Sequence, residues 1–575
     1  MFKRLFSYLG KYKKYTFLAM ICVIAETFFE LIIPLIMADI VDVGVANRDE
    51  PYILRQGIIM AVCALLALAL GTGSARFAAM CGQGLGAEIR KATFRKVQQF
   101  SFANRDKFRT ASLVTRLTGD VTTIQNSVST GMRPAVRSPF MLLTSLIVSF
   151  TINAKLALVF VVAIPILGTC LVLIIRRVRP LYGRMQRAVD LVNRIIQENL
   201  TAIRIVKAYV KGDYETEKFG EVNTELKTTS EKAFGTAVLN MPAMQAVMYA
   251  TILAILWIGG NLIFIGDMKV GELTGFLSYV LQVLNSLMLM SNVFLMLTRS
   301  ITSWRRICEV LDEKNDISED QVKDVAVEHG SIRFEHVSFK YSRDAEEYVL
   351  HDIDLDIQSG QTIGIIGSTG SAKSTLVQLI PRLYEATEGQ IYIDGRPIEE
   401  YPLRHLRDAI AMVLQKNTLF SGTVKENLRW GDPNATDEEI EEACRIACVD
   451  EFIDRLENGY DTELGQGGVN VSGGQKQRLC IARAILKKPK VLILDDSTSA
   501  VDTTTELKIR NGLASCLPEC TKIIIAQRIT SVLNTDKTIV LDDGKIECAG
   551  DHWYLMDHSK VYQEIYNSQQ EGAGL

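Results

Sequence analysis

The stretch Gly367-Ser368-Thr369-Gly370-Ser371-Ala372-Lys373-Ser374-Thr375 decides the fold of the second half of the chain. It follows an apolar run typical of a buried strand, Ile363-Gly364-Ile365-Ile366, and precedes a run typical of a helix, Leu376-Val377-Gln378-Leu379-Ile380. Glycines in such a loop bring backbone N–H groups close to phosphate oxygens, and the helix start adds its positive dipole end. The stretch therefore predicts a phosphate-binding loop in an α/β core.

Three residues of this loop decide how well it works. We expect Lys373 to contact the β- and γ-phosphates of ATP and Ser374 to hold Mg²⁺. Ala372 stands just before the lysine, where the usual pattern has a glycine. Its methyl group is harmless if the residue is already helical and costly if φ must be positive.

Two further motifs follow in a fixed order. The first is Val471-Ser472-Gly473-Gly474-Gln475, and the second is an apolar strand that ends in two acids, Leu492-Ile493-Leu494-Asp495-Asp496-Ser497-Thr498-Ser499-Ala500. Asp495 closes this strand and is expected to orient Mg²⁺. Together the three motifs resemble those of the ATP-binding cassette (ABC) transporter family. The resemblance covers the whole chain, since the region before residue 315 looks like the membrane half of an ABC exporter.

The resemblance implies roles for further positions of the nucleotide site. Residues 367–375 are expected to bind ATP, and Tyr341 matches the position at which the family stacks an aromatic ring on adenine. The signature that contacts the γ-phosphate held by the opposite subunit is matched by Ser472, Gly473, Gly474 and Gln475. Gln415 matches the Q-loop and is expected to take part in catalysis and to reach Mg²⁺, and Asp502 matches the D-loop.

Two positions depart from the family in its catalytic part. Asp496 stands where the general base for the attacking water is normally a glutamate, and Gln527 stands where a switch histidine follows the last core strand. Aspartate is one methylene shorter than glutamate, and a misplacement of about 1 Å at a reacting centre can cost on the order of a hundredfold in rate. None of the six histidines directly follows that strand. We therefore expect weak hydrolysis at this chain's own site.

Composition and charge exclude several classes of protein. A chain of 575 residues predicts at least two domains. The formal net charge of −3 leaves no basic footprint for nucleic acid, so we expect no nucleic-acid partner. The 11 cysteines form no CxxC pair and have no histidine at ligand spacing, which favours reduced thiols over a metal centre.

Long apolar runs before residue 315 predict a membrane all-α domain of six helices, followed by an α/β P-loop ABC nucleotide-binding domain. A span needs roughly 20 apolar residues. The expected spans are 16–42, 56–80, 136–153, 156–176, 241–265 and 273–297. Before them, Phe2, Leu5, Phe6 and Leu9 recur at helical spacing among basic residues, which predicts an interfacial helix. A mitochondrial presequence has a similar pattern.

Basic residues indicate the orientation. The long loops after the second and fourth spans are rich in Lys and Arg, which places them, both termini and the nucleotide-binding domain in the cytoplasm. Stretches 108–121 and 198–209 look like the family's intracellular loops with coupling helices, and an ordinary amphipathic helix is the alternative. The expected domains are a transmembrane domain (1–311), a linker (312–328) and a nucleotide-binding domain (329–575). Expected strands of its core are 331–334, 362–366, 411–414, 491–494 and 523–526.

Two acids lie inside the first span. Glu26 and Glu30 are four residues apart, so they share one helix face near the expected mid-depth of the membrane, where charge is costly and usually functional. Two interpretations stay open. The pair contacts the substrate, or it faces a water-filled vestibule without touching the substrate.

The sequence as a whole is identified as one half of an ABC exporter of the cell membrane, which moves a small amphipathic substrate with ATP and Mg²⁺. Two cassettes must sandwich two ATP molecules, so the chain needs a second half-transporter. The damaged pair Asp496 and Gln527 beside an intact signature favours a heterodimer. The alternatives are a homodimeric exporter and a regulatory ATP-binding subunit that gates a membrane complex without productive turnover.

Overall fold

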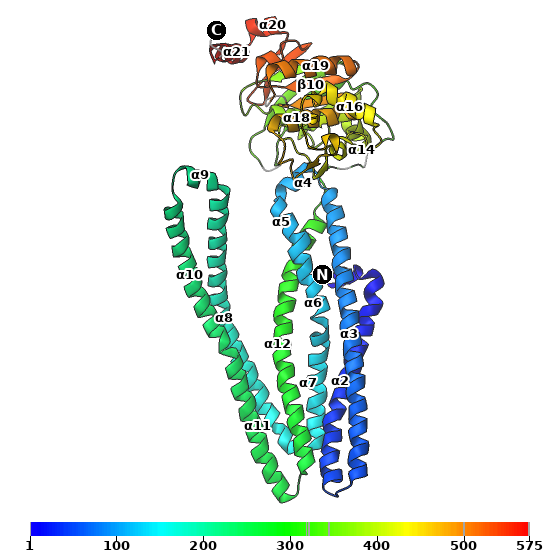
Figure 1. Ribbon diagram of the computed structural model, residues 1–575, viewed down its shortest axis with the longest axis vertical. Helices are drawn as coiled ribbons and strands as arrows, with labels where there is room; N and C mark the ends of the chain where they lie inside the picture. The colour runs from blue at the N-terminus through cyan, green and yellow to red at the C-terminus, as the bar shows by residue number, and fades with distance from the viewer. Residues whose placement is uncertain (1, 318, 320–321, 343–344, 498–500, 573–575) are drawn as a thin grey trace. The chain divides into compact units, whose positions relative to one another are not determined.

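The computed structural model describes residues 2–317, 319, 322–342, 345–497 and 501–572. They form two compact units (Figure 1). We call the first, Met1–Lys96 with Ala111–Asp312, the helical unit, and the second, Val97–Thr110 with Glu313–Leu575, the α/β unit. Long apolar helices followed by an α/β unit confirm the predicted fold class.

Six described stretches are long and apolar enough to cross a membrane: Gly10–Val45, Glu50–Gln98, Thr110–Ile152, Ala154–Thr201, Gly212–Ile265 and Val270–Asp312. One predicted span falls on each. The shortest has 36 residues, which at 1.5 Å per residue is about 54 Å of helix, against roughly 30 Å of hydrocarbon. The helices therefore continue well beyond the bilayer.

The helical unit consists of α-helices with short 3₁₀ and π segments. Its elements are α1 (Phe2–Ser7), η1 (Gly10–Tyr12), α2 (Lys13–Asp39), η2 (Ile40–Val45), α3 (Glu50–Gln98), α5 (Thr110–Thr115), η3 (Arg116–Asp120), α6 (Val121–Ser129), α7 (Met132–Ile152), α8 (Ala154–Thr201), α9 (Ile203–Ala208), α10 (Gly212–Val238), α11 (Asn240–Ile265) and α12 (Val270–Asp312). Helix α12 packs against α7 and α2, whereas α8 packs against α10 and α11 (Figure 1).

Small residues let α3 approach its neighbours closely. A Cβ on Gly82 would lie 2.0 Å from Ser129 Oγ of α6, and a Cβ on Gly84 would lie 2.4 Å from the ring of Tyr12. In membranes, where lipid tails are as apolar as leucine, such close backbone approach is a main source of helix association. The glycines of α3 therefore fix the packing at the end of the bundle next to α1.

The α/β unit is built on a six-stranded sheet in the order β12-β11-β3-β10-β9-β6. All neighbouring pairs are parallel except the edge pair β11–β12. The strands are β3 (Thr362–Ile366), β6 (Ile410–Val413), β9 (Val491–Asp495), β10 (Thr521–Ile525), β11 (Lys537–Asp542) and β12 (Lys545–Gly550). Strands β9 and β10 are buried along their whole length, as continuous apolar strands of a covered parallel sheet should be.

A second, antiparallel sheet has the order β2-β1-β4-β5, from β1 (Ile332–Phe339), β2 (Leu350–Ile357), β4 (Glu388–Ile393) and β5 (Arg396–Pro397). A short pair joins β7 (Gly422–Thr423) and β8 (Glu463–Leu464). The helices of the unit are α4 (Phe102–Lys107), α13 (Lys373–Leu379), α14 (Leu403–Ala409), α15 (Val424–Leu428), α16 (Asp437–Ile446), α17 (Asp450–Ile453), α18 (Gly473–Leu486), α19 (Thr503–Cys516), α20 (His552–His558) and α21 (Lys560–Gly572).

Four of the five predicted core strands coincide with β3, β6, β9 and β10 within two residues at each end. The fifth, 331–334, falls on β1, which is longer and belongs to the antiparallel sheet. The expectation that Gln527 follows the last core strand is wrong, because β11 and β12 come after it. The error has a physical reason. The polar residues Lys537 and Asp542 stand at the two ends of β11, so its buried run is short. A search for long apolar runs does not recognise such a strand.

Helix α4 belongs to the α/β unit although it interrupts the helical unit in sequence. The ring of Phe102 packs against Tyr384 with centroids 5.8 Å apart, and the Tyr384 hydroxyl donates to Asp106 Oδ2 at 2.7 Å. The stretch 108–121, in which we expected a coupling helix, forms α5, η3 and the start of α6. Helix α4 was not predicted, because its six residues are too few to show a periodic pattern.

Candidate nucleotide site

Parallel strands bring the predicted site residues to one edge of the sheet. Strands β3, β10, β9 and β6 lie side by side and run in the same direction, so their carboxyl ends meet. Gly367 follows β3, Asp496 follows β9, and Gln527 lies two residues beyond β10. This edge is where open α/β sheets bind ligands.

The loop between β3 and α13 has the backbone that a phosphate-binding loop requires. A Cβ on Gly367 would lie 2.0 Å from the Leu541 carbonyl oxygen, so only glycine fits there. Ala372, at the N-cap of α13, has φ 68° and ψ 21°. Ala372 is therefore not helical but left-handed, which is the costly one of the two conformations considered above. A glycine at this position would be relaxed.

The side chain of Lys373 is folded back on its own loop. Its Nζ donates to the carbonyl oxygens of Gly367 at 2.9 Å and Ser368 at 2.7 Å. Burial lowers the pKa of Lys373, and the nearby Asp496 and Asp495 carboxylates oppose that shift. Because Ser368 and Gly370 are exposed, phosphate oxygens can reach the loop. They can then accept the hydrogen bonds that Lys373 Nζ now donates to backbone carbonyl oxygens.

Ser374 and Asp495 form the oxygen pair expected to hold the metal. Ser374 Oγ donates to Asp495 Oδ1 at 2.8 Å, and Asp495 is buried. Burial raises the pKa of Asp495, and the hydrogen bond from Ser374 opposes the shift. Hydroxyl and carboxylate oxygens are the ligands that Mg²⁺ takes from protein beside ATP phosphates, so this donor set fits the ion.

Asp496 is held by two amides at the position expected for the general base. Its Oδ2 accepts from Gln527 Nε2 at 2.7 Å and from Gln415 Nε2 at 3.3 Å. The residue itself is left-handed, with φ 48°. Burial raises the pKa of Asp496, and the two amide hydrogen bonds oppose the shift. The structure thus brings together the three residues that the sequence assigned to catalysis.

One contact of this group was missed from the sequence. Gln477 of α18 is buried, and its Nε2 lies 3.4 Å from the Asp496 carbonyl oxygen. This contact therefore links α18, which begins in the signature, to Asp496, which directly follows β9. The available signal was the position of Gln477, a polar residue that comes two residues before the apolar stretch Leu479-Cys480-Ile481-Ala482.

Tyr341 lies at the wall of a cavity of ≈ 860 Å³ in the α/β unit. Its hydroxyl is 2.8 Å from Thr375 Oγ1, and its ring meets that of Tyr384 edge-on at 5.2 Å. The residue is 47% exposed. A ring that is fixed at its edge and open on the cavity suits the stacking role expected for it.

The signature segment forms the start of a helix, as expected. Ser472 is the N-cap of α18, where its hydroxyl accepts from the Gln475 N–H and the Gln475 side chain accepts from the Ser472 N–H. Ser472 and Gly473 are exposed, and Gly474 lies in the first turn. Exposed N–H groups at the start of a 14-residue helix can bind an anion.

The D-loop is described only in part, since Thr498, Ser499 and Ala500 lie outside the described residues. Asp502 caps α19, where its carboxylate accepts from the Thr505 N–H at 3.0 Å and from the Thr505 hydroxyl at 2.7 Å. These hydrogen bonds lower the pKa of Asp502. Its observed contacts are therefore those of a helix cap.

The two acids of the first span are paired with arginines of α7. Glu26 Oε1 contacts Arg133 and lies 3.3 Å from Arg137, and Glu30 Oε2 lies 2.7 Å from Arg137. A Cβ on Gly71 would lie 2.9 Å from Glu26 Oε1, so α3 leaves room for the group. The arginines were missed because Arg133 comes before the predicted third span, 136–153, and Arg137 lies at its very start. Two pairs spaced by four residues were the available signal.

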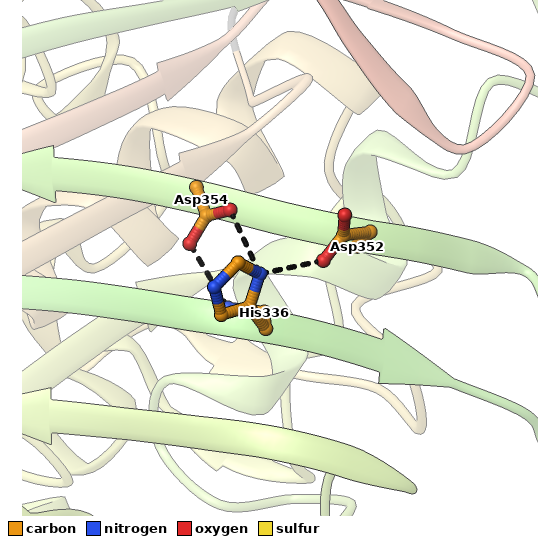
Figure 2. A group of neighbouring side chains, drawn as sticks. All are labelled: His336, Asp352 and Asp354. Atoms are coloured by element: carbon orange, nitrogen blue, oxygen red, sulfur yellow. Dashed lines mark hydrogen bonds and ion pairs between the residues drawn. The ribbon is translucent and has the colours of Figure 1, made fainter.

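A further charged group lies on the antiparallel sheet, away from the nucleotide motifs in sequence. Figure 2 shows His336 of β1 between Asp352 and Asp354 of β2, with His336 Nδ1 2.8 Å and 3.2 Å from their carboxylates. Among the described residues this is the one cluster of three whose ligand atoms are close enough to share a metal ion. All three side chains are more than half exposed, so water screens the attraction between their charges. We therefore interpret the group as a surface ion pair.

Comparison with known proteins gives the family. The family model of the ABC transporter transmembrane region matches residues 16–287, and that of the ABC transporter matches residues 350–499. The uncharacterized ABC transporter ATP-binding protein YfiB of Bacillus subtilis (strain 168) is 38% identical over 563 residues, which cover 98% of each chain.

Two other relatives have descriptive names. The putative multidrug export ATP-binding/permease protein YgaD of Bacillus subtilis (strain 168) is 32% identical and covers 99% of each chain. The ATP-dependent lipid A-core flippase of Desulfotalea psychrophila is 33% identical and covers 85% of each. A solved bacterial Atm1-family ABC exporter with ATP bound has the same fold, with a TM-score of 0.80, 23% identity, and coverage of 97% of this chain and 99% of that one. The chain therefore belongs to the ABC transporter family, as a multi-pass membrane half-transporter that joins one transmembrane region to one ATP-binding cassette.

Proposed function

We propose that this half-transporter exports a hydrophobic or amphipathic substrate, of the drug, lipid or peptide type, across the cytoplasmic membrane at the expense of ATP. The names of two relatives, which describe multidrug export and lipid A-core flipping, support this substrate class. The Lys- and Arg-rich loops support an orientation with both termini and the cassette in the cytoplasm.

In this proposal the cassette binds ATP with the loop 367–375, and Tyr341 stacks on adenine. Ser374, Asp495 and Gln415 hold Mg²⁺, which when bound neutralises phosphate charge. Lys373 leaves its loop carbonyls for the β- and γ-phosphates. The signature residues Ser472, Gly473, Gly474 and Gln475, with Asp502, serve the nucleotide of the partner cassette.

One observation carries the proposal that this chain's own site is weak. The carboxylate of Asp496 is tied to Gln527 and Gln415, which are neutral amides. An amide can donate a hydrogen bond but cannot take up and return a proton as an imidazole does. Asp496 is also one methylene shorter than glutamate, so the base has a shorter reach. Together the two substitutions remove both the reach of the base and the ionisable side chain of the switch.

A second half-transporter with an intact base would make the assembly productive. The signature of this chain is complete and caps its helix correctly, so it can finish the partner's site. The tip formed by α8, α9 and α10 supports a partner as well, because Leu200, Tyr209 and Val210 are 65%, 73% and 87% exposed. Apolar side chains so exposed outside a membrane span are typical of an interface.

The test is to purify the full chain alone and together with a candidate half-transporter, and to measure steady-state ATPase activity. We expect ATP binding with a small residual rate for the chain alone and robust turnover for the pair. Robust turnover by the chain alone would establish the homodimeric exporter instead. ATP binding without turnover in either preparation would establish the regulatory subunit.

A further inference from the structure

The helical unit contains a cavity of ≈ 200 Å³ that is not part of the nucleotide site. Residues of α1, α2, α3, α6, α7 and α12 line it. Its wall is made of aliphatic, thioether and aromatic side chains, among them Leu9, Met20, Leu85, Met296 and Trp304. Sites for whole drug-sized molecules are about 300 to 1,000 Å³. The cavity therefore fits a segment of hydrocarbon chain better than an entire amphipathic molecule.

The lining residues lie at the ends of the predicted spans. Met20 is near the start of the first span, Leu85 comes five residues after the second, and Ala135 comes directly before the third. The ion pair between Arg4 and Asp312 shows that the chain enters and leaves the helical unit at this same end. The cavity thus lies at the level of the membrane boundary, where the glycerol and ester groups of lipids are found.

A tryptophan forms part of the wall. Trp304 is 2% exposed. The ring of Tyr8 meets the indole edge-on, with centroids 6.0 Å apart, and so helps to fix its orientation. The indole therefore gives the cavity a fixed aromatic wall and a fluorescent reporter.

Positive charge borders the same wall. Lys11, Lys13 and Lys14 lie between the lining residues Leu9 and Thr16, and all three are exposed. None of them has an acidic partner within ion-pair distance among the described residues, and the first acid along the sequence is Glu26. Basic residues at a membrane boundary attract anionic headgroups.

We infer that this cavity binds one acyl chain of an anionic phospholipid. The chain fills the apolar space beside Trp304, and the phosphate faces Lys11, Lys13 and Lys14. A bound lipid would join α1 to α3 and α12 from inside the bundle. The inference rests on the membrane location of the helical unit and does not depend on which substrate is exported.

Binding can be measured on the full-length chain, delipidated in detergent and titrated with phosphatidylglycerol, with thermal unfolding as the readout. The neutral-headgroup control is phosphatidylcholine. Trp304→Phe keeps an aromatic ring in the wall, so the half-saturating concentration should change little. Replacing all three lysines with Gln should raise it by about fivefold per lysine.

Matched control variants are available elsewhere in the bundle. Trp257→Phe changes a 78% exposed tryptophan, and Lys269→Gln changes a lysine in the turn before α12; both should bind the lipid as the unaltered chain does. A second readout is independent of stability. Phosphatidylglycerol with brominated chains should quench the fluorescence component that Trp304→Phe removes.

Three results would overturn the inference. One is equal affinity for the two lipids, and another is unchanged affinity for phosphatidylglycerol when all three lysines are replaced. The third is displacement of phosphatidylglycerol by the amphipathic dye rhodamine 6G, which would make the cavity a site for transported molecules.

Discussion

Gln527 Nε2 donates to Asp496 Oδ2 over 2.7 Å, so the residue in the switch position directly holds the residue in the general-base position. Gln415 donates to the same oxygen. Burial already raises the pKa of Asp496, so weak basicity is not what limits this carboxylate. Its limits are the missing methylene and an amide partner that cannot exchange a proton.

The first prediction follows from that pair. Asp496→Glu with Gln527→His should restore both reach and an ionisable switch, and should raise the ATPase rate of the chain alone by roughly a hundredfold. The measurement is steady-state ATP hydrolysis by purified protein in detergent.

The control for this experiment is the same double variant with Lys373→Ala, which should bind no ATP and show no gain. If the double variant binds ATP as tightly as the unaltered chain but hydrolyses it no faster, the two substitutions do not explain the weak site.

A second prediction separates the two contributions of this chain within a heterodimer. Gly474→Asp puts a negative carboxylate in the first turn of α18, where the expected ligand is the partner's γ-phosphate. The loss should be several kcal/mol of transition-state stabilisation, and about 1.4 kcal/mol is tenfold in rate. Asp496→Asn removes a base that hardly works, so most ATPase activity and transport should remain. Equal losses in the two variants would mean that the site with Asp496 turns over.

The phosphate-binding loop and the meeting of Asp496, Gln415 and Gln527 could be predicted from sequence because each motif is contiguous and parallel strands gather their ends at one edge. The φ of Ala372 could not be predicted, because the motif allows both conformations until the backbone is seen. The equal spacing of Glu26/Glu30 and Arg133/Arg137 was a signal for an ion-pair group, but spacing alone does not identify the partners. Glu26 and Arg133 are 107 positions apart, and only helix packing brings them together.

The third prediction concerns Ala372. Because its φ is 68°, Ala372→Gly should relieve left-handed strain of about 1 kcal/mol and tighten ATP binding severalfold. Ala372→Val, with a branched side chain, should do the opposite. Thermal unfolding and titration with a fluorescent ATP analogue measure the two effects. Gly370→Ala is a useful comparison, since a Cβ there meets open space but φ is +92°. Weaker ATP binding by Ala372→Gly would show that the loop needs the methyl group.

The last prediction concerns the charged group inside the membrane. Glu26 is 3% exposed and faces both Arg133 and Arg137, so its charge is already neutralised and is not available to a cationic substrate. Glu26→Gln should leave the arginines without their main counter-ion. Removing one partner of a buried ion pair typically costs about 3 to 5 kcal/mol. We therefore expect a large fall in thermal stability and an equal loss of transport for cationic and neutral substrates.

Glu30→Gln, at a half-buried side chain, should cost much less. The matched control is Glu26→Gln with Arg133→Gln, which removes one charge of each sign and should recover part of the stability. Selective loss of cation transport at unchanged stability would instead place Glu26 in contact with the substrate.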